Sequence, residues 1–363
     1  MLYWLIFILA ALCLLAALIP VLPLSHGLVR IFDFPRTQLL TLTLAVAVAM
    51  LLLLPLNATI ALPGAMLLVA MVIQLIHIAR FTAVWPRTVK TFRGAPSDAQ
   101  TFKVLVSNVK QSNRDYDRLV REIREYDPDL ALFMEVDEDW LAALKDALSQ
   151  FADSVECPLD NSYGMALFSK LELRKKSVRF LLNEKIPSFD CTVSLPNGET
   201  CRLITVHPEP PVPTDDTIGR DAEISLVGLD VRGTDIPVIV TGDLNDVAWS
   251  RTTRRFLRLS GLLDPREGRG QFNSFDARWF FLRWPLDHIF HSAHFQMVRM
   301  KRLAFVGSDH FPMFYELALL RRSADLKSES EDATGDDMEE ARELIDTEKK
   351  RDRKPIGEDW EDG

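Results

Sequence analysis

Three uncharged apolar runs in the first 80 residues constrain this fold more than any other feature of the sequence. They cover residues 2–21, 39–56 and 61–79. At about 1.5 Å per residue, a helix of such length spans or nearly spans a hydrocarbon layer of roughly 30 Å. A cleaved signal peptide fits the first run poorly, because no Lys or Arg precedes it and its apolar segment is too long. We therefore expect three transmembrane helices within residues 1–80, with burial as core helices as the alternative for the last two runs.

Basic residues near these runs predict the side of the membrane on which the rest of the chain lies. Three spans place the loop 23–38 on the same side as everything after residue 79. That side carries the flanking cations Arg30, Arg36, Arg80, Arg87, Lys90 and Arg93, whereas the opposite side carries no Lys or Arg side chain. The positive-inside bias then predicts an inner or plasma membrane protein with a cytoplasmic domain. Three cysteines follow the apolar runs, and this odd number excludes a fully paired disulfide framework.

The pattern changes after a juxtamembrane linker at residues 81–100. Residues 102–106 alternate like a strand, residues 117–126 have helical spacing, and residues 130–134 form a buried strand run. We therefore expect one α/β domain over residues 101–320. Its main part, residues 94–320, has a net charge of −7, so no global field draws it to nucleic acid.

An acidic tail follows this domain. Residues 321–363 are rich in Asp, Glu, Ser and Lys. Such a composition favours disorder, and a partial helix around residues 338–350 is the alternative.

A hairpin is expected around the turn at residues 196–199. With Asn197 and Gly198 at its centre, Cys191 would oppose Ile204 and Cys201 would oppose Ser194. The two thiols would then lie on opposite faces of the sheet and could not form a disulfide.

Chemically active side chains follow the ends of the expected strands. Their carboxylate and amide oxygens, together with imidazoles, suit a hard divalent cation, and an open oxygen-rich site fits Mg²⁺. No Cys–His group has the spacing of a zinc site. The same residue types can support metal-assisted hydrolysis of a phosphoester. The candidate residues are Asn108, Glu135, His207, Asp243, Asn245, Asp287, Asp309 and His310.

Five short motifs in this region resemble those of the endonuclease/exonuclease/phosphatase superfamily, which includes nucleases, inositol polyphosphate phosphatases and neutral sphingomyelinases. The resemblance covers residues 102–320 and is closest to a bacterial membrane-anchored branch. It implies an α/β fold, namely a four-layer α/β/β/α sandwich, here preceded by three transmembrane helices. In chain order the motifs are Ser-Asn-Val at 107–109, Phe-Met-Glu-Val at 133–136, Gly-Asp-Leu-Asn at 242–245, Leu-Asp-His-Ile-Phe at 286–290 and Ser-Asp-His at 308–310.

The resemblance implies a metal side of the site. Glu135 is similar to the principal metal ligand, and Asn108 to the residue that orients metal or phosphate. Asp309 resembles the acid found late in the chain on the metal side. The expected cofactor is Mg²⁺, with Mn²⁺ as a substitute.

The resemblance also implies a catalytic side. Asp243 and Asn245 resemble the pair that aligns the attacking water, with Asp243 as the expected general base. His310 resembles the imidazole that contacts the scissile phosphate and is the alternative base. Asp287 resembles the carboxylate that orients this imidazole, and His207 the second histidine that faces the phosphate.

Candidates for substrate contacts come from two later segments. Arg251, Arg254, Arg255 and Arg258 recur at helical spacing and could contact phosphate, or they could form an ordinary solvated helix face. The segment 278–284 adds two arginines and four aromatic residues, which could stack on bases, dip into lipid or simply pack.

Together these features predict a membrane-anchored, Mg²⁺-dependent phosphoester hydrolase, either a phosphodiesterase or nuclease or a phosphatase. The expected partners are the bilayer and a phosphoester substrate, either nucleic acid or a lipid or inositol head group. The sequence identifies no protein partner. The alternative is a non-catalytic membrane scaffold that retains the sandwich, but the full set of oxygen ligands argues against it.

Overall fold

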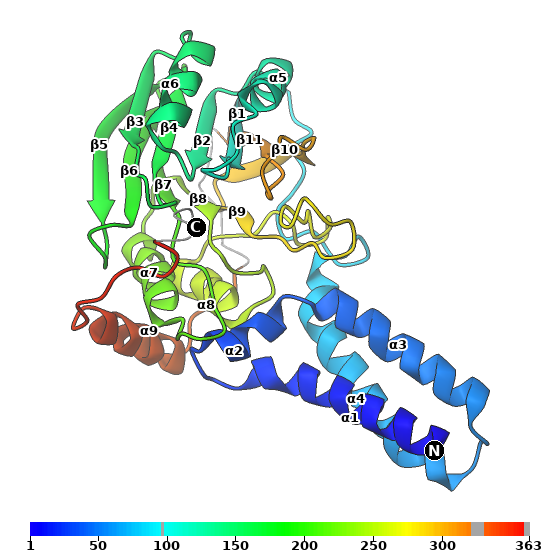
Figure 1. Cartoon of the computed structure of the whole chain (residues 1–363). Helices are drawn as coiled ribbons and strands as arrows, with labels where there is room; N and C mark the ends of the chain where they lie inside the picture. Colours follow the sequence, from blue (N-terminus) through cyan, green and yellow to red (C-terminus); the bar gives the residue numbers. More distant parts are fainter. Residues whose placement is uncertain (96–97, 321–329, 359–363) are drawn as a thin grey trace.

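The computed structural model describes residues 1–95, 98–320 and 330–358, in which a helical bundle projects from a two-sheet domain (Figure 1). The bundle packs along a seam that includes Ala10, Ala17, Leu67 and Ala70, while most other apolar side chains point outward. Three segments, Leu2–Val21, Arg36–Leu53 and Ala58–Phe81, are long and apolar enough to cross a membrane. The bundle helices are α1 (Leu2–Leu18), α3 (Arg36–Leu53) and α4 (Ala61–Ile78), linked by the short α2 (Gly27–Arg30) and 3-10 turns.

Eleven strands form the two sheets of the domain within the described residues. The first sheet has the order β10-β11-β1-β2-β4-β3, and the second the order β5-β6-β7-β8-β9. The first comprises β1 (Ala99–Asn108), β2 (Leu130–Met134), β3 (Asp153–Cys157), β4 (Met165–Ser169), β10 (Phe295–Arg302) and β11 (Met313–Leu320). The second comprises β5 (Glu172–Phe180), β6 (Pro187–Ser194), β7 (Thr200–Val206), β8 (Val238–Asp243) and β9 (Asp287–His291).

The alternation of side chains along β1 explains how the layers form. Val104 and Val106 point into the core between the two sheets, whereas Leu105 packs under helices on the outer face. The second sheet has its own outer core beneath two further helices. The predicted four-layer α/β/β/α sandwich is therefore confirmed. Its covering helices are α5 (Tyr116–Tyr126) and α6 (Glu138–Ala147) on the first sheet, and α7 (Ile218–Val231) and α8 (Arg251–Ser260) on the second.

The acidic tail differs from the expectation of disorder. Helix α9 (Gly335–Glu348) begins at a capping box formed by Thr334 and Asp337. Ala341 and Ile345 of this helix pack against Ala222 of α7. Apolar residues at helical spacing therefore gain a partner surface, which outweighs the acidic composition. Residues 321–329 and 359–363 of the predicted tail lie outside the described residues.

The hairpin register also differs from the expectation. Cys191 pairs with Leu203 and Cys201 with Val193, one residue away from the predicted pairing. This slip places both thiols in the core between the sheets, on one face rather than on two. Both cysteines are nevertheless free, as predicted.

A buried apolar cluster joins the bundle to the domain. Phe34, Ile78 and Phe81 from the bundle side pack with Trp249 and Leu286 from the domain. Trp249 also donates its indole N–H to the carbonyl oxygen of Asp33 at 2.6 Å. The bundle and the domain therefore share a core.

Candidate active site

Five of the predicted site residues line one cleft of about 560 Å³. The strands β1 and β2 run parallel, as do β7 and β8, so their carboxyl ends lie at the same edge of the sandwich. The antiparallel strand β9 begins at this edge, where Asp287 is the register partner of Asp243. Residues that follow distant strands are thereby brought together. Among the cleft-lining residues are Glu135, Asp243, Asn245, Asp309 and His310.

Asn108 connects the two sheets at the base of the cleft. Its side-chain N–H₂ donates to Glu135 Oε1 at 2.7 Å and to Asp243 Oδ2 at 3.1 Å. Its amide oxygen accepts from the backbone N–H of Lys110 at 3.0 Å, which fixes the orientation of the amide. One buried amide therefore holds the carboxylates of both sheets in register.

Glu135 and Asp309 form an acidic side of the cleft. Partial burial and the charge of Asp309 raise the pKa of Glu135 to about 7. Burial would raise the pKa of Asp309, but His310 and Lys110 outweigh it and lower that pKa. Lys110 donates to Asp309 Oδ2 at 3.1 Å. The two carboxylates thus repel each other, and Lys110 and Arg278 lie within ion-pair distance of Asp309.

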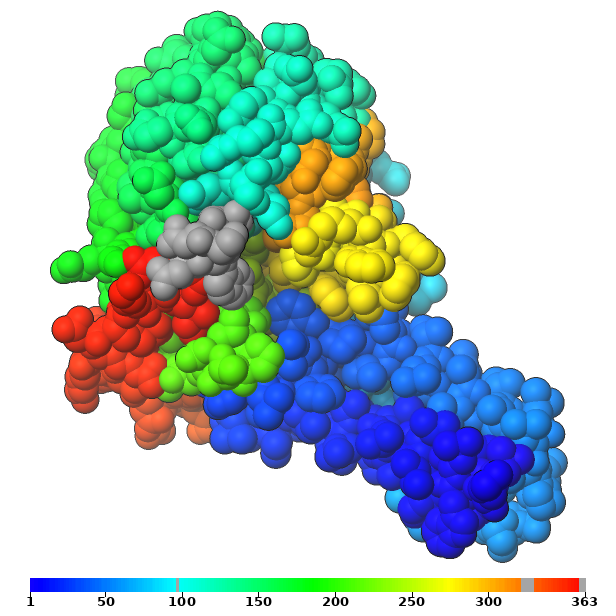
Figure 2. Space-filling view, viewed as in Figure 1, coloured from blue at the N-terminus to red at the C-terminus, as the bar shows by residue number. Residues whose placement is uncertain are grey.

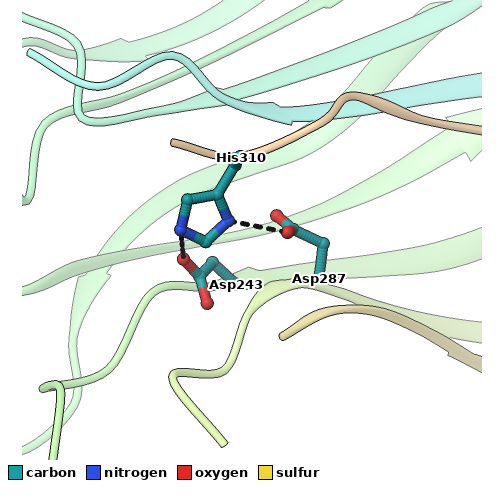
Figure 3. Close-up of side chains that lie close together, drawn as sticks. All are labelled: Asp243, Asp287 and His310. Atoms are coloured by element: carbon teal, nitrogen blue, oxygen red, sulfur yellow. Dashed lines mark hydrogen bonds and ion pairs between the residues drawn. The ribbon is translucent and has the colours of Figure 1, made fainter. Parts of the chain in front are cut away.

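Asp287, His310 and Asp243 form a second group, shown in Figure 3. The imidazole Nδ1 of His310 lies 2.8 Å from Asp287 Oδ2, and its Nε2 lies 3.4 Å from Asp243 Oδ2. Burial would lower the pKa of His310, but the Asp287 and Asp243 carboxylates outweigh it and raise the pKa to about 10. Burial also raises the pKa of Asp243. The imidazole is therefore held in the protonated state between two carboxylates.

His207 and Asn245 complete the predicted set. His207 is buried with its Nε2 4.0 Å from Asp243 Oδ2, and burial lowers its pKa to about 4. The backbone N–H of Asn245 donates to Asp243 Oδ1 at 2.9 Å, while its side chain donates to the Pro208 carbonyl at 3.0 Å. His207 is therefore neutral, and Asn245 orients one oxygen of Asp243.

The donor chemistry of the cleft fits a divalent cation. In the described part of the chain, the Glu135 carboxylate receives hydrogen bonds from neutral groups, namely Asn108 and the backbone of Gln111, and makes no ion pair. A cation between Glu135 and Asp309 would relieve their repulsion. Asp243, Asp287 and His310 also lie close enough to hold a metal ion. However, their geometry is that of a hydrogen-bonded chain, because His310 Nδ1 is already directed at Asp287.

The four arginines of α8 are not brought to this cleft. Each of them forms an ion pair, and three of the four arginines pair with α9. The charge that suggested phosphate binding is thus neutralised within the chain, and the helical spacing marks the docking face for the tail. The pairs are Arg251–Glu340 at 2.6 Å, Arg255–Glu340 at 2.5 Å, Arg258–Asp337 at 2.6 Å and Arg254–Glu267 at 2.6 Å.

Other residues line the cleft in addition to those predicted. Lys110 lines the cleft and directly follows the Ser-Asn-Val motif at 107–109. This position next to a motif was the signal that could have identified Lys110 in the sequence. Phe275 and Trp284 contribute an aromatic wall. Arg278, in the late arginine and aromatic segment, lies 3.8 Å from Asp309 Oδ2. Lys110 and Arg278, rather than the α8 arginines, therefore line the cleft.

Solved structures with the same fold come from several organisms. A Bacteroides thetaiotaomicron endonuclease/exonuclease/phosphatase family protein is 22% identical, with 62% of this chain and 100% of that chain covered and a TM-score of 0.51. D. rerio TDP2 complexed with a single strand DNA product is 16% identical, with 60% and 98% covered and a TM-score of 0.51. The human Nocturnin catalytic domain with bound sulfate is 17% identical, with 61% and 94% covered and a TM-score of 0.51.

Sequence comparisons give the family directly. No curated protein matches the chain. Residues 101–310 match the model of the Endonuclease/Exonuclease/phosphatase family, which is more than half of the chain and includes every predicted metal and catalytic residue. The chain therefore belongs to the endonuclease/exonuclease/phosphatase family, whose members are phosphoester hydrolases.

Proposed function

We propose that this protein is a membrane-anchored, Mg²⁺-dependent phosphoester hydrolase. The observation that carries the proposal is the cleft in which Glu135 and Asp309 face the chain of Asp287, His310 and Asp243. Family membership supports hydrolysis of phosphoesters. The three apolar helices support the membrane anchor.

Glu135 and Asp309 would hold the cation, and Asn108 would orient the Glu135 carboxylate through its hydrogen bond to Oε1. When bound, Mg²⁺ supplies a Lewis acid that polarises the phosphoryl oxygen. Lys110 and Arg278 would add positive charge on the same side of the cleft, because both lie within ion-pair distance of Asp309. These groups stabilise the charge that develops on the phosphoryl oxygens.

Asp243 is the proposed general base. Its raised pKa makes it a better proton acceptor than an exposed carboxylate, and the Asn245 N–H fixes the direction of Oδ1. His310 is protonated, so it donates a hydrogen bond to the phosphoryl oxygen instead of accepting a proton from water. Asp287 holds this imidazole in place through Nδ1. Neutral His207, with its Nε2 4.0 Å from Asp243 Oδ2, would be the second histidine that faces the phosphate.

Hydrolysis of soluble p-nitrophenyl phosphate and bis-p-nitrophenyl phosphate tests the proposal. The full-length protein in detergent should release p-nitrophenol with Mg²⁺, lose that activity in chelator and regain it with Mg²⁺ or Mn²⁺. Glu135→Gln should raise the Mg²⁺ concentration needed for half-maximal rate at least about tenfold, because it removes one charged ligand.

Glu199→Gln provides the matched control, because Glu199 is a partly exposed glutamate on the β6–β7 turn that does not line the cleft. It should leave the Mg²⁺ requirement unchanged. Full activity in chelator, or no activity on either ester with either metal, would refute metal-dependent hydrolysis and favour the non-catalytic scaffold.

A further inference from the structure

The connection between two candidate membrane spans forms part of the cleft wall. Ile31, Phe34 and Pro35, which lie between α1 and α3, line the same 560 Å³ space as Asp243 and His310. The ring of Phe34 meets that of Trp284 edge-on, with centroids 5.8 Å apart. The site is thus built partly from the segment that would lie at the membrane surface.

The position of the cleft relative to the bundle is fixed. Arg220, which is buried, donates to the carbonyl oxygen of Asn245 at 3.0 Å and pairs with Asp221 at 2.8 Å. Arg220 also lies 3.6 Å from Asp246, the residue after Asn245. The same loop leads to Trp249, whose indole N–H donates to the backbone carbonyl oxygen of Asp33. The catalytic loop after β8 is therefore tied to the base of the bundle.

An exposed aromatic loop lies beside the first turns of α3. We call Trp279, Phe280 and Phe281 the aromatic loop; their side chains are 52%, 82% and 51% exposed. Gln38 of α3 donates to the carbonyl oxygen of Phe281 at 2.8 Å, and Figure 2 shows this segment (yellow) directly against the blue helices. The aromatic loop is thus held beside a candidate span while its rings remain uncovered.

A groove between the aromatic loop and α3 reaches along the candidate span. It has a volume of about 640 Å³, and its lining includes Phe280, Phe281, Leu42 and Ala45. Ala45 lies nine residues after the start of α3, which is about 13 Å along a helix axis. If α3 spans the bilayer, the rings of the aromatic loop enter the interfacial region, where aromatic side chains are favoured.

Arginine side chains line the end of this groove that faces the domain. Arg283 and Arg302 line the groove, and both guanidinium groups lie over the ring of Phe311, at 4.9 and 4.6 Å. Arg278 lines the neighbouring cleft. Along α3 the groove lining therefore changes from apolar at Leu42 and Ala45, through the polar first turns of the helix, to cationic at the domain. This order matches a molecule with acyl chains and a phosphorylated head group.

We propose that the substrate is a membrane phospholipid, whose phosphoester head group enters the cleft while its acyl chains remain in the bilayer beside α3. This inference rests on the proposed function. A nucleic acid is the less favoured substrate, because residues 94–320 carry a net charge of −7 and the arginines of α8 are already paired. Phe34 and Trp284 form an apolar part of the cleft wall, which provides no positive charge to bind the phosphates of a nucleic acid.

Hydrolysis of lipid by the full-length protein tests the inference. The protein is reconstituted in phosphatidylcholine vesicles that carry phosphatidylglycerol, phosphatidic acid or phosphatidylinositol 4-phosphate, and the released head group or phosphate is measured by mass spectrometry. The deacylated glycerophosphoester of each lipid is assayed in parallel. We expect kcat/KM for at least one lipid to exceed that for its deacylated form at least about tenfold, because acyl chains add apolar contact.

A variant pair separates membrane contact from a general loss of activity. In Phe280→Ser/Phe281→Ser, the ratio of lipid to p-nitrophenyl ester turnover should fall at least about tenfold, since two apolar rings no longer enter the interface. The control is Phe180→Ser at the end of β5, which removes a phenylalanine that is 46% exposed. Figure 1 shows β5 on the side of the domain away from α3. The control should keep the wild-type ratio.

The results distinguish the two proposals. Hydrolysis of the p-nitrophenyl esters or of a single-stranded oligonucleotide without hydrolysis of any lipid would overturn the lipid inference and leave the proposed function standing. Equal turnover of every lipid and its deacylated form would also overturn it. Lack of turnover of every phosphoester would refute both.

Discussion

Asp287 acts on this site through a single imidazole. Its Oδ2 is 2.8 Å from His310 Nδ1, and Ser274 accepts a hydrogen bond from the Asp287 backbone N–H at 3.1 Å. The carboxylate does not line the cleft, so the role we propose for Asp287 is to position His310. Its negative charge is one of those that keep the pKa of His310 at about 10 despite burial.

Asp287→Asn should therefore lower kcat for the soluble ester by about 10²-fold or more, through loss of the protonated, oriented imidazole. The variant removes an effect that raises the His310 pKa, so the alkaline limb of the pH–rate profile should move to lower pH. His310→Ala should be similarly severe, and the double variant scarcely worse than either single variant, because residues that act as a unit are not additive. The pH–rate profiles and the cycle of three variants provide the measurement. Additive losses, or an unmoved alkaline limb in Asp287→Asn, would show that Asp287 does not act through His310.

At the scale of elements, α9 is the clearest case of a segment stabilised by its partners. Its apolar side contacts α7, and its acidic side meets the arginines of α8. A side-chain hydrogen bond from Arg258 lowers the pKa of Asp337, and the Thr334 capping interactions lower it further. A group whose pKa is lower in the folded state stabilises the fold above its unfolded pKa and loses that contribution as the pH falls.

Asp337→Asn should therefore reduce stability at neutral pH by about 1 kcal/mol, which is typical of a lost helix cap. The difference in Tm between the variant and the wild type should shrink as the pH falls below about 4, where an unfolded Asp becomes protonated. Thermal unfolding of both proteins in detergent, from neutral pH to below about pH 4, measures this difference in Tm. Asp336→Asn, an exposed neighbour in the same helical turn, should show a much smaller difference. A pH-independent effect of Asp337→Asn would mean that its charge does not contribute to docking.

At the scale of the whole molecule, the orientation in the membrane determines which substrates the cleft can reach. With three spans, the loop that holds Ile31 and Phe34 lies on the same side as the domain. Both flanks of that side are basic, with Arg30 and Arg36 in the loop and Arg80 after the third candidate span. The cleft would then open onto the inner leaflet.

Reporter fusions at the C-terminus test this orientation in bacterial cells. Green fluorescent protein fluoresces in the cytoplasm but not after export by the Sec pathway, so its fusion should be fluorescent. The alkaline phosphatase fusion should be inactive. Arg30→Glu/Arg36→Glu should weaken this bias, because the positive-inside rule counts cations in short loops. An active phosphatase without fluorescence would place the domain outside.

Much of the site was predictable because its residues stand in local patterns. Asn108 and Asp243 end buried strands, and Glu135 directly follows one. Parallel pairing brings Asn108 and Glu135 to one edge of the first sheet, and stacking of the two sheets places Asp243 beside Asn108. The three candidate spans were visible for a similar reason, since length and apolar composition are properties of one segment. The family and the four-layer fold are confirmed.

The tertiary structure alone decided what covers each face. Helical spacing placed Arg251, Arg255 and Arg258 on one stripe, but spacing does not reveal that the acidic helix α9 lies on it. The hairpin register depended on the turn and on core packing, so a one-residue slip moved a cysteine to the other face. Phe34 precedes its neighbour Trp284 by 250 residues and carries no motif of its own. Contacts over such separations depend on how the bundle and sandwich pack, and no local pattern encodes that packing.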